Sequence, residues 1–204
     1  MSAIRTGALG GRRCMIAVAA VCGCLAITGC AESAPRGTLT EGDLPEPARV
    51  VDVLLDVQGG QTSCSAVNNA EDDEVMTPSP NYDRDRHAAV SYKLAGDGGE
   101  WVSDSVWRLS SPDAAVAKVA TGLDACVAEH PDHYARFTVT GHPEAVGYTA
   151  VEHEPTHVYT RRILAPLDDR VVIVSAQREG DDDFMVPPES ILDRAIERSG
   201  DAPR

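Results

Sequence analysis

The stretch from Ser103 to Val127 constrains the fold most, because it holds a strand, a helix start and a cysteine in one run. In its first part Val106 points to one face and Trp107 to the other, an alternation typical of a half-buried strand. Ser111 then offers a side-chain oxygen to the free N–H groups of a first helical turn, and Pro112 follows where its missing N–H costs nothing. This run therefore predicts a strand followed directly by a helix.

The apolar residues after Pro112 recur at a spacing of three and four, which places them on one side of a helix. They are Val116, Val119, Ala120, Leu123 and Val127. Cys126 lies at the edge of this stripe. We expect the helix to pack its apolar side on a sheet and to carry one half of a disulfide.

Further strands are predicted on both sides of this run, joined by short turns that favour antiparallel neighbours. The predicted strands are residues 87–95, 101–109, 134–140, 145–153, 156–164 and 170–177. Residues 44–57 favour a first helix, with a strand as the alternative, and a last helix follows Pro187 and Pro188. The order predicts an α+β domain with a twisted antiparallel sheet of about five to six strands, helices on one face and the other face free.

The first 29 residues have the pattern of a signal peptide. Three arginines precede the apolar run from Met15 to Ile27, which is too short to span a membrane. The tetrapeptide that ends in Cys30 (I-T-G-C) resembles the bacterial lipobox, which implies that Cys30 is diacylated and becomes the mature N-terminus. An ordinary secretory signal, with Cys30 incidental, is the alternative. We expect a signal peptide at 1–29, a lipidated tether at 30–42 and one domain at 43–204, held on the extracytoplasmic face of the cell membrane.

Export would leave few cysteines to pair. Of the six in the chain, three lie in the signal peptide and Cys30 takes the lipid, so that Cys64 and Cys126 remain. In an oxidising compartment we expect them to form a disulfide, contributing on the order of 4 kcal/mol by closing a loop of about sixty residues. Two free buried thiols are the alternative.

The charge of the chain limits its partners. The formal net charge is −14, and losing the three arginines of the signal peptide leaves 15 basic and 32 acidic residues, a net charge of −17. Such a surface repels phosphate backbones, so nucleic acid is not an expected partner, whereas cationic ligands and basic proteins remain compatible. The polar stretch from Gln61 to Arg86, with four acidic residues at 71–74, lacks the spacing of an EF-hand and is interpreted as a solvated loop.

The sequence from His153 to His157 (H-E-P-T-H) matches the zinc-peptidase motif H-E-x-x-H letter for letter. That chemistry requires a helix, and Pro155 inside it would cost about 3 kcal/mol. The flanking residues favour strands, so we interpret the motif as a hairpin tip and expect no enzyme and no cofactor. A looser metal site, formed by His153 and His157 with His130 and His133, remains an alternative.

The second half of the chain resembles a known family. The segments V-W-R-L-S-S-P-D-A-A, L-D-A-C, A-R-F-T-V and R-V-V-I-V, between Ser103 and Arg204, resemble actinobacterial lipoproteins related to the extracellular sensor domain of PknH-type serine/threonine kinases. The resemblance covers about half of the chain and implies a twisted antiparallel sheet in a binding or sensing module. In the kinase family that the chain resembles, the sensor domain is expected to contain two disulfides, whereas the mature chain has cysteines for only one disulfide.

These observations favour an extracytoplasmic, membrane-anchored lipoprotein that binds a small ligand or a component of the cell envelope. The first alternative is a protein–protein interaction subunit of an envelope complex, using the free sheet face or the acidic loops. The second is a metal-dependent hydrolase using His153, Glu154 and His157.

Overall fold

The computed structural model describes residues 34–46, 48–55, 64–73, 87–96, 99–152 and 157–202. All of them belong to one compact unit, Ser33–Arg204, and the predicted signal peptide and Cys30 lie outside the described residues. The helices are α1 (Ser65–Asp73), α2 (Pro112–Glu129) and α3 (Leu192–Ser199), with the 3₁₀ turns η1 (Glu41–Asp43) and η3 (Pro188–Ser190). The strands are β1 (Val50–Leu55), β2 (His87–Leu94), β3 (Trp101–Arg108), β4 (Tyr134–Phe137), β5 (Val146–Glu152), β6 (Val158–Leu167) and β7 (Arg170–Glu179). None of the described helices is long and apolar enough to cross a membrane.

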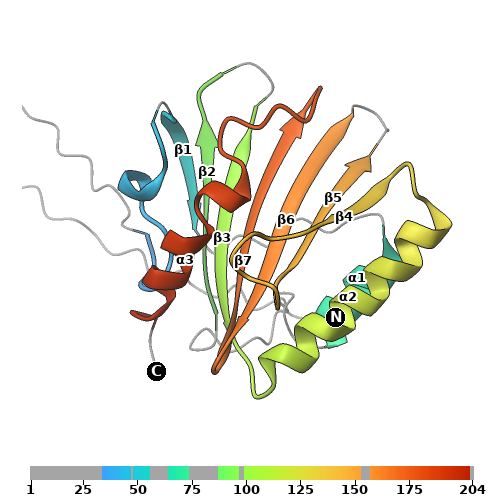
Figure 1. Ribbon diagram of the computed structural model, residues 1–204. Coiled ribbons are helices and arrows are strands. Elements are labelled where there is room, and N and C mark those ends of the chain that lie inside the picture. The colour runs from blue at the N-terminus through green and yellow to red at the C-terminus, as the bar shows by residue number, and fades with distance from the viewer. Residues whose placement is uncertain are drawn as a thin grey trace, which may run out of the picture. The chain divides into compact units, whose positions relative to one another are not determined.

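The strands form one seven-stranded sheet in the order β1-β2-β3-β7-β6-β5-β4, and all neighbours are antiparallel (Figure 1). The α+β class is confirmed, but the expected five to six strands were too few. The missing one is β1, which we had predicted as a helix. Five of its six residues are valine or leucine, and they fall on both faces of the strand, so the sequence lacks the alternation that marks a strand.

Both faces of the sheet are covered by a core, and the central strand β7 contributes apolar side chains to each of them. Val171 and Ile173 point to one face, here called the α2 face, where they share a core with α1 and α2. Val172 and Val174 point to the opposite face, the α3 face, where they share a second core with α3. The prediction of helices on one face was therefore wrong, and the central strands offer no bare face to a partner within the described part of the chain.

The α2 face is closed by two helices that lie side by side (Figure 1). The helix predicted after Ser111 is confirmed as α2, but the predicted cap is not, since the Ser111 side chain makes no capping hydrogen bond. The helix α1 lies in the stretch that we had predicted as a solvated loop. Cys64, Val67 and Ala70 are spaced by three residues and are buried, and this short stripe attaches α1 to the core. Gly122 lets the helices approach closely, since a Cβ atom there would lie 2.6 Å from the carbonyl oxygen of Ala66.

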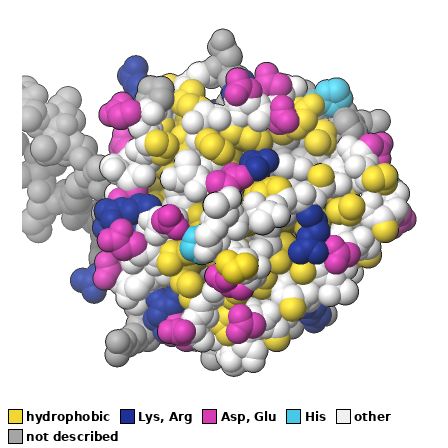
Figure 2. All heavy atoms as spheres, in the orientation of Figure 1, with side chains coloured by type: hydrophobic (Ala, Val, Ile, Leu, Met, Phe, Trp, Pro, Cys, Tyr) yellow, Lys and Arg dark blue, Asp and Glu magenta, His cyan; other side chains and the backbone are white. Residues whose placement is uncertain are grey.

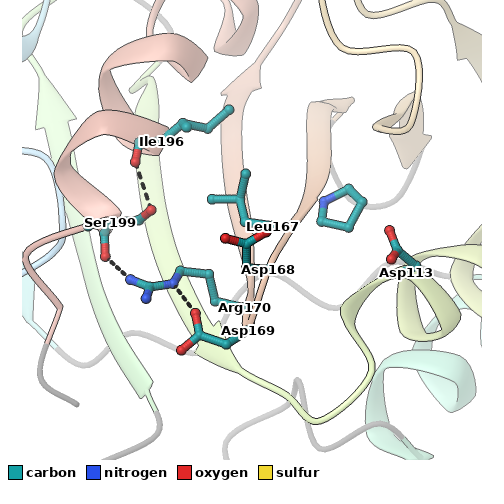
Figure 3. A pocket seen from close by; sticks show the side chains of 9 residues that line it. Asp113, Leu167, Asp168, Asp169, Arg170, Ile196 and Ser199 are labelled. Carbon is teal, nitrogen blue, oxygen red and sulfur yellow. Dashed lines mark hydrogen bonds and ion pairs between the residues drawn. The ribbon is translucent and has the colours of Figure 1, made fainter.

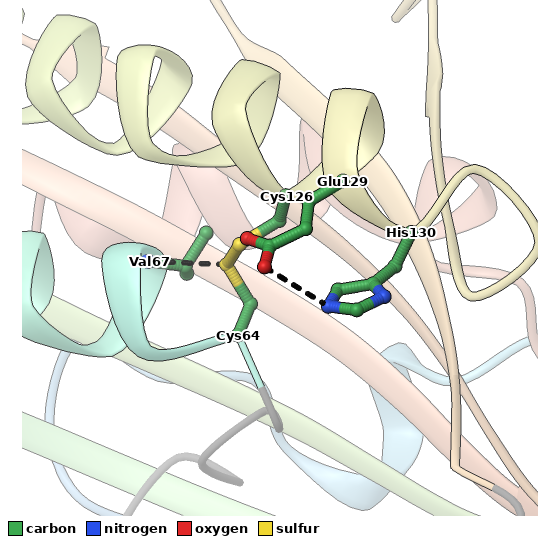
Figure 4. The surroundings of a disulfide bond; sticks show 5 residues. All are labelled: Cys64, Val67, Cys126, Glu129 and His130. Carbon is green, nitrogen blue, oxygen red and sulfur yellow. Dashed lines mark hydrogen bonds and ion pairs between the residues drawn. A yellow bond between two sulfur atoms is a disulfide. The ribbon is translucent and has the colours of Figure 1, made fainter.

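The predicted disulfide is present between Cys64, which precedes α1, and Cys126 in α2 (Figure 4). The Cα atoms are 6.0 Å apart and both residues are buried. The backbone N–H of Val67 donates a hydrogen bond to Sγ of Cys64 at 3.3 Å, so the sulfur also holds the first turn of α1. The crosslink thus fastens the short helix α1 to the long helix α2.

The α3 face is completed by residues 34–44, which we call the N-terminal strap. Leu39 of the strap is fully buried in the core of this face. Gly37 has a φ of +89°, and a Cβ atom there would lie 2.5 Å from that of Ala202, so the strap also fits closely against the C-terminal residues. Residues 34–42 of the predicted tether therefore form part of this layer.

Candidate functional site

A hollow lies beside the turn between β6 and β7, where the start of α2 and the end of α3 come close (Figure 3). We call it the turn hollow, and its volume is about 470 Å³. Small-molecule sites in proteins commonly fall between about 300 and 1,000 Å³. Its lining residues are Asp113, Pro166, Leu167, Asp168, Asp169, Arg170, Ile196, Ser199 and Gly200.

The apolar part of the turn hollow comes from the last residues of β6 and from α3. Pro166 is buried, whereas Leu167 and Ile196 are half-buried and keep part of their surface open to the hollow. The short turn expected between the predicted strands 156–164 and 170–177 is confirmed at Asp168 and Asp169, since Leu167 pairs with Arg170 across the β6–β7 hairpin. Short polar residues at this position reverse the chain and leave carboxylates at its tip.

One of these carboxylates, Asp169, belongs to the structure of the hollow. It accepts hydrogen bonds from Arg170 and from Arg108, both at 2.7 Å, and these arginines hold the pKa of Asp169 below its usual range, with the hydrogen bond from Arg170 as the largest cause. Arg170 also donates to the carbonyl oxygen of Ser199 at the end of α3, where a positive charge is favoured. Arg108 reaches the carbonyl oxygen of Ala202 at 3.3 Å. Both arginines are therefore committed to joining the strands to the end of α3.

The other two carboxylates, Asp113 and Asp168, are exposed at the rim of the hollow. Asp113 lies in the first turn of α2, and Asp168 at the tip of the hairpin. Within the described residues neither has an ion pair, in contrast to Asp169. Figure 2 shows acidic side chains spread between apolar ones, with the basic side chains scattered among them. Two rim carboxylates above an apolar floor suit a ligand that has a positive charge and a hydrocarbon part.

A second polar cluster lies on the α2 face. It is a row across four neighbouring strands, formed by Arg162, Ser175, Ser103 and Ser91. Arg162 is 3% exposed, and the hydroxyl oxygens of Ser91 and Ser103 are 2.6 Å apart. The cavity beside them has a volume of about 10 Å³, room for about one water molecule. The row is therefore too closed to hold an organic ligand as it stands.

The H-E-P-T-H motif joins β5 to β6, which are paired up to Glu152 and Val158. His153 to Thr156 lie outside the described residues, whereas His157 is exposed directly before β6. His130 and His133 lie near this end of β5, because the N–H of Val151 donates to the carbonyl oxygen of His133 at 2.9 Å. In the described part of the chain, no three His, Cys, Asp or Glu residues lie close enough to hold a metal ion.

None of the residues that line the turn hollow was predicted from the sequence as part of a site. Asp113, Asp168 and Ile196 are far apart in the chain, and each has an ordinary local role: first helical turn, hairpin tip and helix stripe. The sequence signal that could have indicated Asp168 is its position next to Asp169. If one carboxylate of this pair binds an arginine, the other stays available for a ligand. The approach of α2 and α3 follows only from the packing on both faces of the sheet.

The described residues thus form an α+β domain with a seven-stranded antiparallel sheet between two layers. No family model matches the sequence, and no curated protein matches it. Among solved structures, the chain is similar to the extracellular domain of PknH from Mycobacterium tuberculosis, with a TM-score of 0.49 and 11% sequence identity. The match covers 80% of this chain and 91% of that one.

Proposed function

We propose that this chain is an extracytoplasmic, lipid-anchored module that binds a small organic cation in the turn hollow. The observation that carries the proposal is the combination of a volume of about 470 Å³, an apolar floor and two rim carboxylates without an ion pair among the described residues. The binding is non-enzymatic in this proposal, since the described residues that line the hollow place no nucleophile beside a base.

Two features support an extracytoplasmic location. The disulfide between Cys64 and Cys126 is of a kind that persists in oxidising compartments and is rare in the cytosol. The lipobox-like tetrapeptide ending in Cys30 follows a signal-like segment. A lipid on Cys30 would place the anchor only four residues before Ala34, the first described residue.

The chemistry of the hollow points to a primary or quaternary ammonium group with a short apolar part. Exposed carboxylates attract a cation over several ångströms, and the acidic surface raises its local concentration. Leu167, Pro166 and Ile196 would cover the hydrocarbon part and add affinity through burial of apolar surface. Arg170 is held by Asp169 and Ser199, so it would not compete for the rim carboxylates.

The first test is native mass spectrometry of the exported protein, purified from membranes of an actinobacterial host with mild detergent. We expect a retained organic mass in the wild type and its loss in the double variant Asp113→Asn, Asp168→Asn. Asp182→Asn is a control that removes a carboxylate away from the hollow. A wild type without any retained mass, or a mass that survives in the double variant, would contradict binding in this hollow.

The anchor is tested separately by labelling cells with radioactive palmitate. We expect the label in the wild-type chain and none in Cys30→Ala, whereas equal labelling of both would refute lipidation at Cys30. Because this assay does not depend on the ligand, failure of the anchor and failure of the hollow are distinguishable.

A further inference from the structure

The N-terminal strap is held on the sheet by two hydrogen bonds at one residue. The backbone N–H of Leu39 donates to Oδ2 of Asp104 at 2.7 Å, and its carbonyl oxygen accepts from the hydroxyl of Tyr92 at 2.8 Å. The Leu39 side chain is fully buried between them and α3. The strap therefore closes over two polar side chains in the middle of the α3 face.

Asp104 is an unusual residue for this position. It is 1% exposed in the middle of β3, and its Oδ1 atom has no hydrogen-bond partner among the described residues. Its neighbours Ser103 and Ser105 point to the opposite face, so the carboxyl group lies among the valines of the α3 face. A carboxylate with one hydrogen bond in such surroundings is costly to ionise.

The charged and titratable groups near Asp104 and its neighbour Tyr92 come from β2, η1 and α3. Tyr92 lies on β2, Asp43 and Glu41 lie in η1, and Arg198 lies on α3. Arg198 is bound to both carboxylate oxygens of Asp43, at 3.0 and 2.9 Å, which offsets its charge. Burial raises the pKa of Asp104 to about 7, the N–H of Leu39 lowers it in part, and the charge of Asp43 adds to the rise. Burial likewise raises the pKa of Tyr92, which stays protonated.

We propose that the N-terminal strap is a pH-dependent latch, docked on the sheet while Asp104 is protonated and loosened when Asp104 ionises. Undocking exposes Asp104 to water and returns its pKa toward the ordinary value of 3.8. The docked state therefore binds the proton more tightly than the undocked state. Its extra stability is fully present below pH 3.8 and is lost as the pH rises through 7.

The latch affects the distance between the membrane and the domain, because the predicted lipid anchor lies just before the strap. If Cys30 carries the lipid, a point that rests on the proposed function, the docked strap leaves only a few residues between the membrane and the domain. Release of the strap, residues 34–44, would add up to about 40 Å of extended chain. The latch would then set how far the ligand-binding domain stands from the membrane.

The test measures hydrogen exchange of the Leu39 amide in the full mature chain at pH 5 and pH 8, in the wild type and in Asp104→Asn. Asparagine keeps the oxygen that accepts from the Leu39 N–H but cannot ionise. Dividing the exchange rate of the wild type by that of Asp104→Asn at the same pH therefore cancels the intrinsic effect of pH on exchange. We expect this ratio to rise roughly 100-fold from pH 5 to pH 8, from linkage across the interval between the two pKa values. A ratio that does not change would overturn the proposal.

Tyr92→Phe is the matched control. It removes the other hydrogen bond to Leu39 without removing the titrating group, so it should loosen the strap by a similar factor at both pH values. If Asp104→Asn does not fold, the carboxyl ¹³C signal of Asp104 in the wild type decides the matter. A midpoint near pH 7 supports the latch, and a midpoint near pH 4 overturns it. Neither reading depends on lipidation, so the latch can fail while the anchor stands.

Discussion

The disulfide permits the best-defined prediction of stability. Replacing Cys64 and Cys126 together by alanine should lower the free energy of unfolding by about 4 kcal/mol. The two residues are 62 positions apart, and closing a loop of this length restricts the unfolded chain by roughly that amount. Alanine is chosen over serine, because serine would bury a hydroxyl group at two positions that are 3% and 6% exposed.

The assay is urea unfolding followed by circular dichroism, comparing the oxidised wild type, the reduced wild type and the double variant. Reduction keeps both side chains and separates the crosslink from the lost sulfur atoms. Hydrogen exchange should show α1 losing protection before α2, because α1 is short and is fastened by Cys64. An unchanged urea midpoint on reduction, or equal protection of both helices, would refute the account of the crosslink.

Three further predictions follow from particular contacts. Gly122→Ala should destabilise the protein by about 1 to 2 kcal/mol in urea unfolding, since the new methyl group meets the Ala66 backbone at 2.6 Å and this outweighs the gain in helix propensity; a more stable variant would contradict the close approach. Burial raises the pKa of Asp43, but hydrogen bonds from Arg198, Thr40 and Arg194 outweigh it and hold the pKa well below 3.8, so this stabilisation is present above pH 3.8 and is lost as the pH falls further. Asp43→Asn should therefore shrink the loss of thermal stability between pH 5 and pH 3, and an unchanged loss would refute the role of Asp43. The exported protein should carry no zinc that EDTA removes in elemental analysis, whereas one equivalent would restore the histidine motif as a metal site.

The parts of the fold that local pattern determines were predictable. The helix after Ser111 has a start signal and a stripe of five apolar residues, and the strands after it alternate or are bounded by turns. The last helix predicted after Pro187 and Pro188 is confirmed as α3, where Leu192 and Ala195 are buried. The pairing of Cys64 with Cys126 followed from counting, because only two cysteines remained.

The parts that depend on contacts distant in the sequence were not predictable. β1 is apolar at nearly every position, and α1 is mostly polar with a short buried stripe, so neither shows the period of its own structure. The strap looked like a tether, because the burial of Leu39 depends on Asp104 and Tyr92, more than fifty residues away. The turn hollow likewise arises where the layers on the two faces of the sheet approach the same hairpin.

The most direct test of the central claim is an NMR titration of the ¹⁵N-labelled mature domain with benzylamine, a cation that carries a small apolar ring. The account predicts saturable shifts for the amides around Asp113, Asp168 and Ile196, with none of them in the double variant Asp113→Asn, Asp168→Asn. Shifts confined to other surfaces, or no shifts at millimolar benzylamine, would contradict a cation site in the turn hollow.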